Sequence, residues 1–485
     1  MITKHTKSEI MKKLLTLFCS LAISAIAMAQ DADIKILGIN DMHSGVQNFP
    51  KLAYVVDSIR ALHPDVLLMA AGDNRTGNPV NDMHEVPNLP MVELMNAVDF
   101  NASSMGNHEC DLNARNFAYS INESQFPYIV ANVYPADTLK LHLQPFKLFE
   151  HQGVRLGVIG FVQVNEGGTP DCMPSKVAGI RFTDPFKEAD KYRWLRDQCD
   201  VYIALNHLGL EVDTLFADAH PEFDLMICGH SHDIVPGLMR NGVLITQAKR
   251  DAQYINEIDL KVRGGKVVEK KCKLIDVRAA SGENAKVKAM VERFSDNPKL
   301  IRVLTNALTP FERKEELGSL MADADAAIAK ADLSIVNSGS VRYSTKESGP
   351  FTLSDVLRLD PFGNTIYVLE LTGDELKALL DELPTTDEYG PAYASGFQYT
   401  IAADKNGKYV VKDMKTADGK KLNMQKKYKV AIDNFVYQTN NTILGKPYTD
   451  TYITTSDALT EFLEAQPSVD YKGVNRVTIV GGNHR

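Results

Sequence analysis

Five short segments place potential metal ligands directly after apolar stretches of the sequence. Imidazole, amide and carboxylate groups without thiolates suit Mn²⁺, Zn²⁺ or Fe²⁺ rather than Ca²⁺. Seven candidate ligands are too many for one ion. They suit two divalent ions that share a carboxylate, an arrangement that activates water against a phosphoryl group. The candidates are Asp41, His43, Asp73, Asn107, His207, His230 and His232.

The elements that must position these side chains are strands. An apolar, strand-like run precedes every segment, and strands alternate with helical stretches from Asp33 to about Ile275, which predicts an α/β domain. In open α/β sheets, ligands bind at the carboxyl ends of the strands, so the five segments should meet at one rim. The runs span residues 34–39, 66–71, 100–105, 201–205 and 225–228.

Each segment alone has an ordinary interpretation. A single histidine after a strand is more often a core or surface residue, and a Gly-Asp pair usually marks a turn. Gly106-Asn107-His108-Glu109 and Gly229-His230-Ser231-His232 are much rarer by chance. Five such segments in order, each at a strand end, favour the metal site.

Composition and charge exclude several classes of protein. The chain has 485 residues, which predicts two or three domains. Hydrophobic residues make up 44% and charged residues 24%, as in soluble globular proteins. The formal charge of -9 disfavours binding to nucleic-acid polymers, which requires a basic surface, but it is compatible with a small anionic ligand held by a local cationic site.

The first 29 residues have the pattern of a secretory signal peptide. Lys12-Lys13 precede an apolar run over residues 14–29 that is too short to span a membrane, and Ala27-Met28-Ala29 suits cleavage after Ala29. A buried core helix is the alternative. We expect a secreted protein, in a bacterial periplasm, with no membrane-spanning segment after cleavage.

The second part of the chain has a different pattern. Residues 278–305 predict a linker that ends in a helix. Beyond residue 306, strands are expected over residues 333–336, 366–371 and 428–432, and helices over 317–330 and 373–383. Thr372-Gly373-Asp374-Glu375 has the form of a capping box before the last of these helices. The mixture predicts an α+β domain over residues 306–485.

The order of these motifs resembles the calcineurin-like metallophosphoesterases. The second domain is similar to that of the secreted bacterial 5′-nucleotidase family, which includes UDP-sugar hydrolases and 2′,3′-cyclic nucleotide phosphodiesterases. The resemblance covers nearly the whole mature chain. It implies a four-layer α/β sandwich, two mixed sheets flanked by helices, over residues 31–277. A linker helix over 278–305 and an α+β substrate-recognition domain over 306–485 would follow.

The resemblance also implies roles for residues of the first domain. Water acidified by two cations would attack phosphorus, while His108 stabilises the developing charge or protonates the leaving oxygen, and Asp111 orients His108. The metal ligands would form two sets joined by one carboxylate: Asp41, His43 and His232; Asn107, His207 and His230; and Asp73 between them.

In the second domain, the resemblance implies two arginines that grip the phosphate. The segment from Asn337 to Arg342 resembles the family pattern N-x-G-G-x-R, with Ser340 in place of the second glycine. Arg313 stands where the family has a substrate-facing arginine. Guanidinium groups bind phosphate bidentately, whereas the ordinary alternative for either arginine is a surface salt bridge.

An aromatic clamp for the nucleobase is implied as well. Pro361-Phe362-Gly363-Asn364 matches the family's PFGN motif, in which the phenylalanine stacks on the base, although Phe362 could instead be a core residue. The family's glycine-rich segment with a second stacking ring is missing after residues 429–432. Phe435 and Tyr437 are the candidates to replace that ring.

These observations predict a periplasmic two-metal phosphohydrolase that releases phosphate from nucleoside 5′-monophosphates. The metals and Phe362 would lie on opposite walls of a cleft between the domains. The alternatives are a 2′,3′-cyclic nucleotide phosphodiesterase, a UDP-sugar or nucleotide pyrophosphatase on the same metals, and a non-catalytic nucleotide-binding protein. The partner would be a small nucleotide or another phosphate ester, and the chain would be a monomer or weak dimer.

Overall fold

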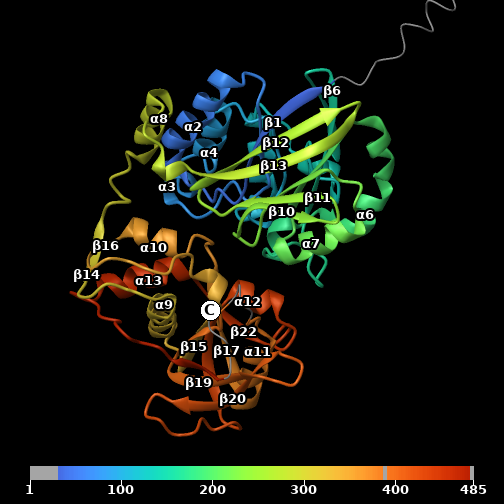
Figure 1. Ribbon diagram of the computed structural model, residues 1–485. Helices are drawn as coiled ribbons and strands as arrows, with labels where there is room; N and C mark the ends of the chain where they lie inside the picture. Colours follow the sequence, from blue (N-terminus) through green and yellow to red (C-terminus); the bar gives the residue numbers. More distant parts are fainter. Residues whose placement is uncertain (1–30, 386–389, 481–485) are drawn as a thin grey trace, which may run out of the picture.

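The computed structural model describes residues 31–385 and 390–480. The expected signal peptide, residues 1–29, lies outside the described residues. Figure 1 shows an N-terminal domain, coloured blue to yellow, above a C-terminal domain in orange and red. No helix of the described part of the chain has the length and apolar character needed to cross a membrane.

Two sheets form the centre of the N-terminal domain. In the first sheet, of order β13-β12-β1-β2-β3, the last three strands run parallel. In the second, of order β10-β11-β9-β8-β6-β5, strands β6, β8, β9 and β11 run parallel. The first sheet contains β1 (Ala32–Ile39), β2 (Leu67–Ala70), β3 (Ala102–Ser103), β12 (Tyr254–Arg263) and β13 (Lys266–Asp276). The second contains β5 (Phe146–His151), β6 (Val154–Val162), β8 (Val201–His207), β9 (Leu225–Cys228), β10 (Ile234–Arg240) and β11 (Val243–Ala248). Strands β4 (Val133–Pro135) and β7 (Ile180–Phe182) pair separately.

The two sheets pack face to face, and helices cover both outer faces. Along β1, Ile34 and Ile36 point into the core between the sheets, whereas Leu37 and Ile39 point toward the helices. Strands buried on both faces read as nearly continuous apolar runs. This arrangement confirms the expected four-layer sandwich. The helices are α2 (Phe49–Leu62), α3 (Pro79–Asp82), α4 (Leu89–Ala97), α5 (Ala114–Glu123), α6 (Pro185–Lys191), α7 (Leu210–Ala219) and α8 (Ala285–Ser295).

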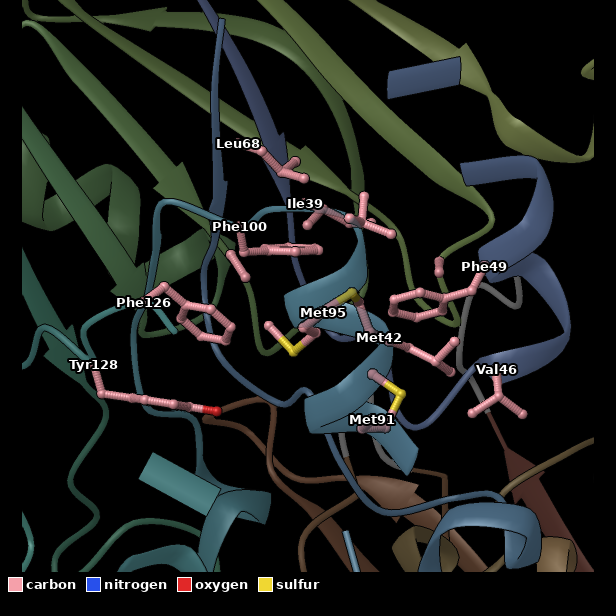
Figure 2. Packing of buried hydrophobic residues seen from close by; sticks show 14 of the residues in the cluster. Ile39, Met42, Val46, Phe49, Leu68, Met91, Met95, Phe100, Phe126 and Tyr128 are labelled. Carbon is pink, nitrogen blue, oxygen red and sulfur yellow. The ribbon is translucent and has the colours of Figure 1, made fainter. Parts of the chain in front are cut away.

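The core beneath the first sheet supports the loop that follows β1. Met42, which separates two candidate ligands, is fully buried and packs with Phe49 and Met91 (Figure 2). Buried apolar groups of this size contribute about 1.5–3 kcal/mol each to stability. The ligand loop is therefore anchored by packing. Helix α8 belongs to the same core through Val287 and Val291, so the expected linker helix packs on the N-terminal domain.

A five-stranded sheet organises the C-terminal domain in the order β18-β15-β21-β17-β22. Helices α11 and α12 and a three-stranded sheet cover one face, and α9 and α13 cover the other. The five strands are β15 (Leu333–Val336), β17 (Thr365–Thr372), β18 (Tyr393–Ser395), β21 (Lys427–Asp433) and β22 (Tyr448–Thr454). The smaller sheet has β19 (Phe397–Ala403), β20 (Tyr409–Thr416) and β23 (Val477–Val480), and β14 (Val303–Ala307) pairs with β16 (Gly349–Thr352). The helices are α9 (Lys314–Ala329), α10 (Leu353–Leu359), α11 (Gly373–Glu382), α12 (Asn434–Thr439) and α13 (Thr455–Glu464).

The two domains meet through helix α10. It contacts α3 of the N-terminal domain, beside it in Figure 1, and Leu357 packs against the core beneath the first sheet. The mixture of helices with antiparallel and parallel strands confirms the α+β character expected for the second domain.

Candidate metal centre

The seven candidate ligands converge where both sheets present the carboxyl ends of their parallel strands. One half of the group follows β1, β2 and β3 of the first sheet, and the other half ends β8 or follows β9 of the second. The convergence that the sequence pattern predicted is therefore present across two sheets. Three overlapping sets of side chains each bring their ligand atoms within 4.8 Å of one another: Asp41, His43 and His232; Asp41, Asp73 and His207; and His43, Asp73 and His108, the last of which is not one of the seven candidates.

The backbone at this rim takes unusual conformations. Five of the seven candidates have positive φ: Asp41, His43, Asp73, His230 and His232, with values from 42° to 85°. Positive φ is uncommon for residues other than glycine, and such strain gathers at functional sites. Gly72, at φ 81°, also has no room for a side chain, because a Cβ would lie 2.5 Å from the backbone nitrogen of Gly106.

Asp41, His43 and His232 form the first set. The Nε2 atoms of His43 and His232 are 2.9 Å apart, and Asp41 Oδ1 lies 3.8 Å from the first and 3.4 Å from the second. Three ligand atoms of neutral imidazole and carboxylate type thus face one small volume. That donor set matches the N and O ligands of a first-row divalent ion.

Asn107, His207 and His230 form the second set. Asn107 Oδ1 lies 3.2 Å from His207 Nε2 and 2.9 Å from His230 Nδ1. Asp73 stands between the sets, with Oδ2 3.1 Å from His207 Nε2 and 3.9 Å from His43 Nε2. One carboxylate therefore reaches both groups.

Hydrogen bonds to backbone carbonyls orient these ligands. His43 Nδ1 lies 3.0 Å from the Thr76 oxygen, and His207 Nδ1 lies 2.7 Å from the Ala71 oxygen. A proton on Nδ1 donated to the carbonyl leaves the Nε2 lone pair free to face a cation. The Asn107 amide donates to the Asp171 oxygen over 3.1 Å, which turns Oδ1 into the cluster.

The electrostatics of the cluster suit cations. Burial alone would raise the pKa of Asp73, but His207 and His108 hold that pKa well below its usual value. Burial, reinforced by Arg342, lowers the pKa of His43 far enough to keep the imidazole neutral. Ionised carboxylate and neutral imidazole are the forms that bind metal. Burial would likewise lower the pKa of His207, yet Asp73 and Asp41 raise it to about 10, so the same two carboxylates that would attract a cation also favour the protonated ring.

Glu109 supports the site without facing it, a role that sequence reasoning missed. Its buried carboxylate accepts hydrogen bonds from the backbone nitrogens of Asp73 at 3.1 Å, Asn74 at 2.8 Å and Gly106 at 2.6 Å. It therefore ties the loop after β2 to the loop after β3. The sequence feature that could have indicated this role is the Gly-Asn-His-Glu motif.

His108 and Asp111 lie beside the ligands as predicted. Asp111 Oδ2 is 2.7 Å from His108 Nδ1, and His108 Nε2 is 3.9 Å from Asp73 Oδ2. Burial disfavours the imidazolium, but the carboxylates of Asp111 and Asp73 outweigh it and raise the pKa of His108. The contact with Asp111 holds the His108 ring in one orientation, and both carboxylates favour its protonated form.

A pocket at the ligand cluster is lined by both domains. Arg342 Nη2 lies 3.4 Å from His43 Nε2, and the Arg342 guanidinium lies over the Phe362 ring, 5.5 Å from its centroid. Phe362 in turn stacks on His108, with centroids 5.8 Å apart and planes at 24°. The lining residues are Asp73, Asn107, His108, His230, His232, Arg250, Lys314, Gly339, Val341 and Arg342. Arg342 and Phe362, predicted from the motifs, therefore reach the cluster.

The other predicted substrate residues lie in different settings. Arg313 is exposed at the start of α9, with Nη2 3.7 Å from Glu316 Oε1, and does not line the pocket. Asn337 Oδ1 accepts a hydrogen bond from Ser340, at 2.5 Å, and so stabilises the loop that carries Arg342. Asn364 is buried, and its backbone oxygen accepts from the Thr455 amide at 2.8 Å.

The two aromatic candidates on α12 differ. Tyr437 is buried against Tyr367 and donates its hydroxyl proton to the Lys446 oxygen at 2.9 Å, so its ring fills the core. Phe435 is half-buried and offers the more accessible ring. Sequence reasoning also missed two pocket residues, Arg250 and Lys314. No motif marks Arg250, and Lys314 is one position from the residue that was chosen.

Both halves of the chain match known protein families. Residues 34–233 match the calcineurin-like phosphoesterase family, and residues 299–444 match the 5′-nucleotidase C-terminal domain family. A 5′-nucleotidase of Vibrio cholerae is 28% identical, covering 96% of this chain and 97% of the relative. Protein UshA of Yersinia enterocolitica is 27% identical, covering 92% of each. Among solved structures, a 5′-nucleotidase precursor from Thermus thermophilus has a TM-score of 0.83 at 20% identity, covering 93% of this chain and 100% of that one.

Proposed function

The chain belongs to the 5′-nucleotidase family of calcineurin-like phosphoesterases, and on that premise we propose that it is a two-metal phosphohydrolase that releases phosphate from nucleoside 5′-monophosphates. Membership makes it a phosphoester hydrolase. The number of metals and the substrate are the parts that we propose.

The position of Asp73 carries the proposal. Its Oδ2 atom lies within 3.9 Å of a nitrogen in each ligand set, 3.1 Å for His207 and 3.9 Å for His43. A single cation would leave one of the two sets without a charge to bind. Two divalent ions that share the Asp73 carboxylate would use all seven candidates. Mn²⁺, Zn²⁺ and Fe²⁺ fit the mixture of imidazole, amide and carboxylate.

The residues of the chain divide the chemistry between them. Divalent ions at this site would neutralise charge on the phosphoryl oxygens and lower the pKa of a bound water molecule. His108, held by Asp111 at 2.7 Å, donates a proton from Nε2 to the phosphate or to the leaving oxygen. Arg342 binds a phosphate oxygen through its guanidinium group, which has no carboxylate partner among the described residues.

The charge of the pocket favours a monoester. Lys314 and Arg342 both line it, and neither forms an ion pair with a carboxylate in the described part of the chain. A phosphomonoester carries a charge of about −2 near pH 7, whereas a diester carries −1. The two unpaired cations therefore match the monoester. This supports nucleoside 5′-monophosphates over the 2′,3′-cyclic nucleotides.

Recognition of the base rests on Phe362. Its half-buried ring stacks on His108, a residue that lines the pocket, so one face of the ring becomes available to a base when the two rings separate. Stacking tolerates any base, which predicts low selectivity among nucleobases. Phe435 is our candidate for the second ring of the clamp.

A substrate panel tests the proposal. Protein that begins at residue 30 is supplied with Mn²⁺, and phosphate release is measured from AMP, UMP, 2′,3′-cyclic AMP, UDP-glucose and a plain aryl phosphate. We expect fast release from AMP and UMP that a chelator abolishes. Release from cyclic AMP or UDP-glucose alone would mean that these compounds, and not nucleoside monophosphates, are the substrates. Tight AMP binding without any release in the presence of metal would indicate a binding protein.

We also propose that the enzyme acts outside the cytoplasm, in a bacterial periplasm. The support is the pattern of residues 1–29, with a basic start, an apolar run and Ala27-Met28-Ala29. Mass spectrometry of the protein recovered from a periplasmic extract should find a first residue at Gln30. Recovery of the uncleaved chain in the cytoplasmic fraction would contradict export.

A further inference from the structure

Three cationic side chains from three separate segments face the pocket. Arg342 follows β15, Lys314 is the first residue of α9, and Arg250 follows β11 of the N-terminal domain. Arg342 belongs to a motif, whereas the other two carry no motif. Neither of these two is a metal ligand, so their presence beside the cluster needs another reason.

Lys314 has no partner within the described residues. Its side chain forms no ion pair and no hydrogen bond there, although it is half-buried. Burial lowers the pKa of Lys314, Arg342 and Arg250 both lower it further, and Glu315 opposes them. Leaving an ammonium group half-buried beside two guanidinium groups is unfavourable unless an anion occupies the space between them.

Arg250 is fixed to the metal-binding loops. The Asp251 amide donates to the Asp41 oxygen at 2.8 Å, and the Asn40 side chain donates to the Lys249 oxygen at 2.7 Å. The guanidinium is steadied by Asp251, whose Oδ2 lies 3.0 Å from Nε. These contacts hold Arg250 beside the cluster as part of the N-terminal domain, whereas Lys314 belongs to the C-terminal domain.

We propose that Lys314 and Arg250 are phosphate-binding residues, one from each domain, that make the site selective for dianionic phosphomonoesters over monoanionic diesters. The inference rests on the proposed phosphohydrolase function and deepens it. Arg250 binds the phosphate group from the N-terminal domain. Lys314 adds an unpaired charge from the C-terminal domain, so it contributes more to a dianion than to a monoanion.

Arg313, the residue before Lys314, is the alternative candidate for the phosphate contact made by this segment. It is the residue that the family pattern favoured, but its guanidinium is exposed and lies near Glu316. Arg313 is the extended residue directly before α9, whereas Lys314 is the first helical residue, so the two side chains leave the backbone in different directions. The structure assigns the place in the pocket to Lys314.

Charge selectivity tests Lys314. Activity of the full mature protein is measured with p-nitrophenyl phosphate and bis-p-nitrophenyl phosphate for Lys314→Met, Arg313→Gln and Lys330→Met, the last an exposed lysine at the end of the same helix. We expect Lys314→Met to lower kcat/KM for the monoester about tenfold or more, the effect of one lost charge-assisted contact, and to change the diester less than about threefold. Lys330→Met should match the parent.

Two results would overturn the assignment of Lys314. One is a ratio of monoester to diester activity in Lys314→Met that equals the ratio of the parent. The other is a fall in that ratio in Arg313→Gln rather than in Lys314→Met. Unchanged thermal unfolding of the variants ensures that either result reports recognition rather than folding.

Binding of inorganic phosphate tests Arg250 without any turnover. Calorimetry on Mn²⁺-loaded protein compares the parent, Arg250→Gln, Arg250→Lys and Arg278→Gln, the last an exposed arginine that is also paired with a nearby aspartate, Asp276. We expect the Kd for phosphate to rise about tenfold in Arg250→Gln, with partial rescue in Arg250→Lys and no change in Arg278→Gln. Metal content should be equal in all four.

The two failures can be told apart. A parent protein that binds phosphate through Arg250 but hydrolyses no ester would contradict the proposed function and leave this inference standing. An Arg250→Gln variant that binds phosphate as tightly as the parent would overturn the role of Arg250, even if hydrolysis is fast.

Discussion

Two groups of buried aspartates, one at the candidate metal cluster and one in the C-terminal domain, have pKa values shifted in opposite directions. At the metal cluster, Asp41 and Asp73 face imidazole groups, which outweigh burial and hold both pKa values below the usual range. In the C-terminal domain, burial raises the pKa of Asp325, Asp360 and Asp433, and no basic side chain offsets it. The first group is therefore held in the ionised form, whereas in the second, which we call the neutral group, burial shifts the balance toward the protonated form.

The neutral group supports the loops that carry the substrate residues. Asp433 accepts a hydrogen bond from the Val436 amide at 2.7 Å and so caps α12, and its other oxygen lies 3.4 Å from the Ser340 hydroxyl. Asp360 immediately precedes Pro361 and Phe362. The comparison shows that a buried carboxyl group is not by itself a sign of metal binding, because its neighbours determine its charge.

Removing charge from the first group should have the largest effect. Asp73→Asn deprives both ligand sets of their shared carboxylate, so we expect kcat/KM for AMP to fall about 10³-fold or more, since metal ions supply several kcal/mol of charge stabilisation. Phosphate release and metal content by mass spectrometry measure the result. Asp360→Asn, the matched change in the neutral group, should retain its metals. Full metal content and activity in Asp73→Asn would erase the distinction between the two groups.

Removing His108, the proposed proton donor beside Asp73, should have the second-largest effect on activity. His108→Ala removes a general acid but no assigned ligand, so kcat should fall about 10²–10³-fold while both metals remain bound. Steady-state kinetics and metal analysis on the same preparation give both quantities. Loss of a metal in this variant would move His108 into the ligand set, where its distance of 3.9 Å from Asp73 would allow it.

A substitution in the loop that carries Phe362 should weaken substrate binding rather than slow the chemical step. Phe362→Ala removes the stacking ring, and KM for AMP should rise about tenfold, the value of one base stacked on an aromatic ring. KM for a plain aryl phosphate, which carries no nucleobase, should rise less. Equal losses on the two substrates would mean that Phe362 acts through its contact with His108 instead.

The smallest effect concerns stability and pH. Burial raises the pKa of Asp360 to about 7, whereas an aspartate of the unfolded chain releases its proton near about 3.9. Between these values the native state binds more protons, so the free energy of unfolding falls as pH rises, by at most about 1.4 kcal/mol per pH unit for one group. Asp360→Asn should flatten this decline between about pH 5 and about pH 7.

Urea unfolding at several pH values measures that slope. Glu347→Gln, which alters an exposed carboxylate of the same domain, is the control and should keep the slope of the parent. A variant Asp360→Asn with the slope of the parent would show that Asp360 is ionised in the native state, and the contrast between the two groups would then be wrong for this residue.

The metal cluster was predictable because its signal is local. Each candidate ligand follows an apolar strand, and the rule that parallel strands end at one edge brings distant residues together without any knowledge of side-chain packing. The strands at residues 225–228 and 333–336 were predicted with the bounds that the structure gives. The β12–β13 hairpin was not predicted as a pair, although Gly264-Gly265 marks its turn.

What the sequence could not reveal depends on packing between distant segments. Arg250 and Lys314 become pocket residues only because α9 is positioned against the loop after β11. The sequence pattern favoured Arg313, whereas the residue that lines the pocket is Lys314, the next one along the chain. Tyr437 and Phe435 are two residues apart, and only the fold of α12 decides which ring enters the core.

A metal titration tests the central claim most directly. Metal-free protein that begins at residue 30 is titrated with Mn²⁺, and bound metal and phosphate release from AMP are followed together. The account predicts that two ions bind per chain and that activity reaches its maximum only as the second ion binds. Full activity with one ion bound, or activity that survives complete removal of metal, would contradict a pair of ions joined by Asp73.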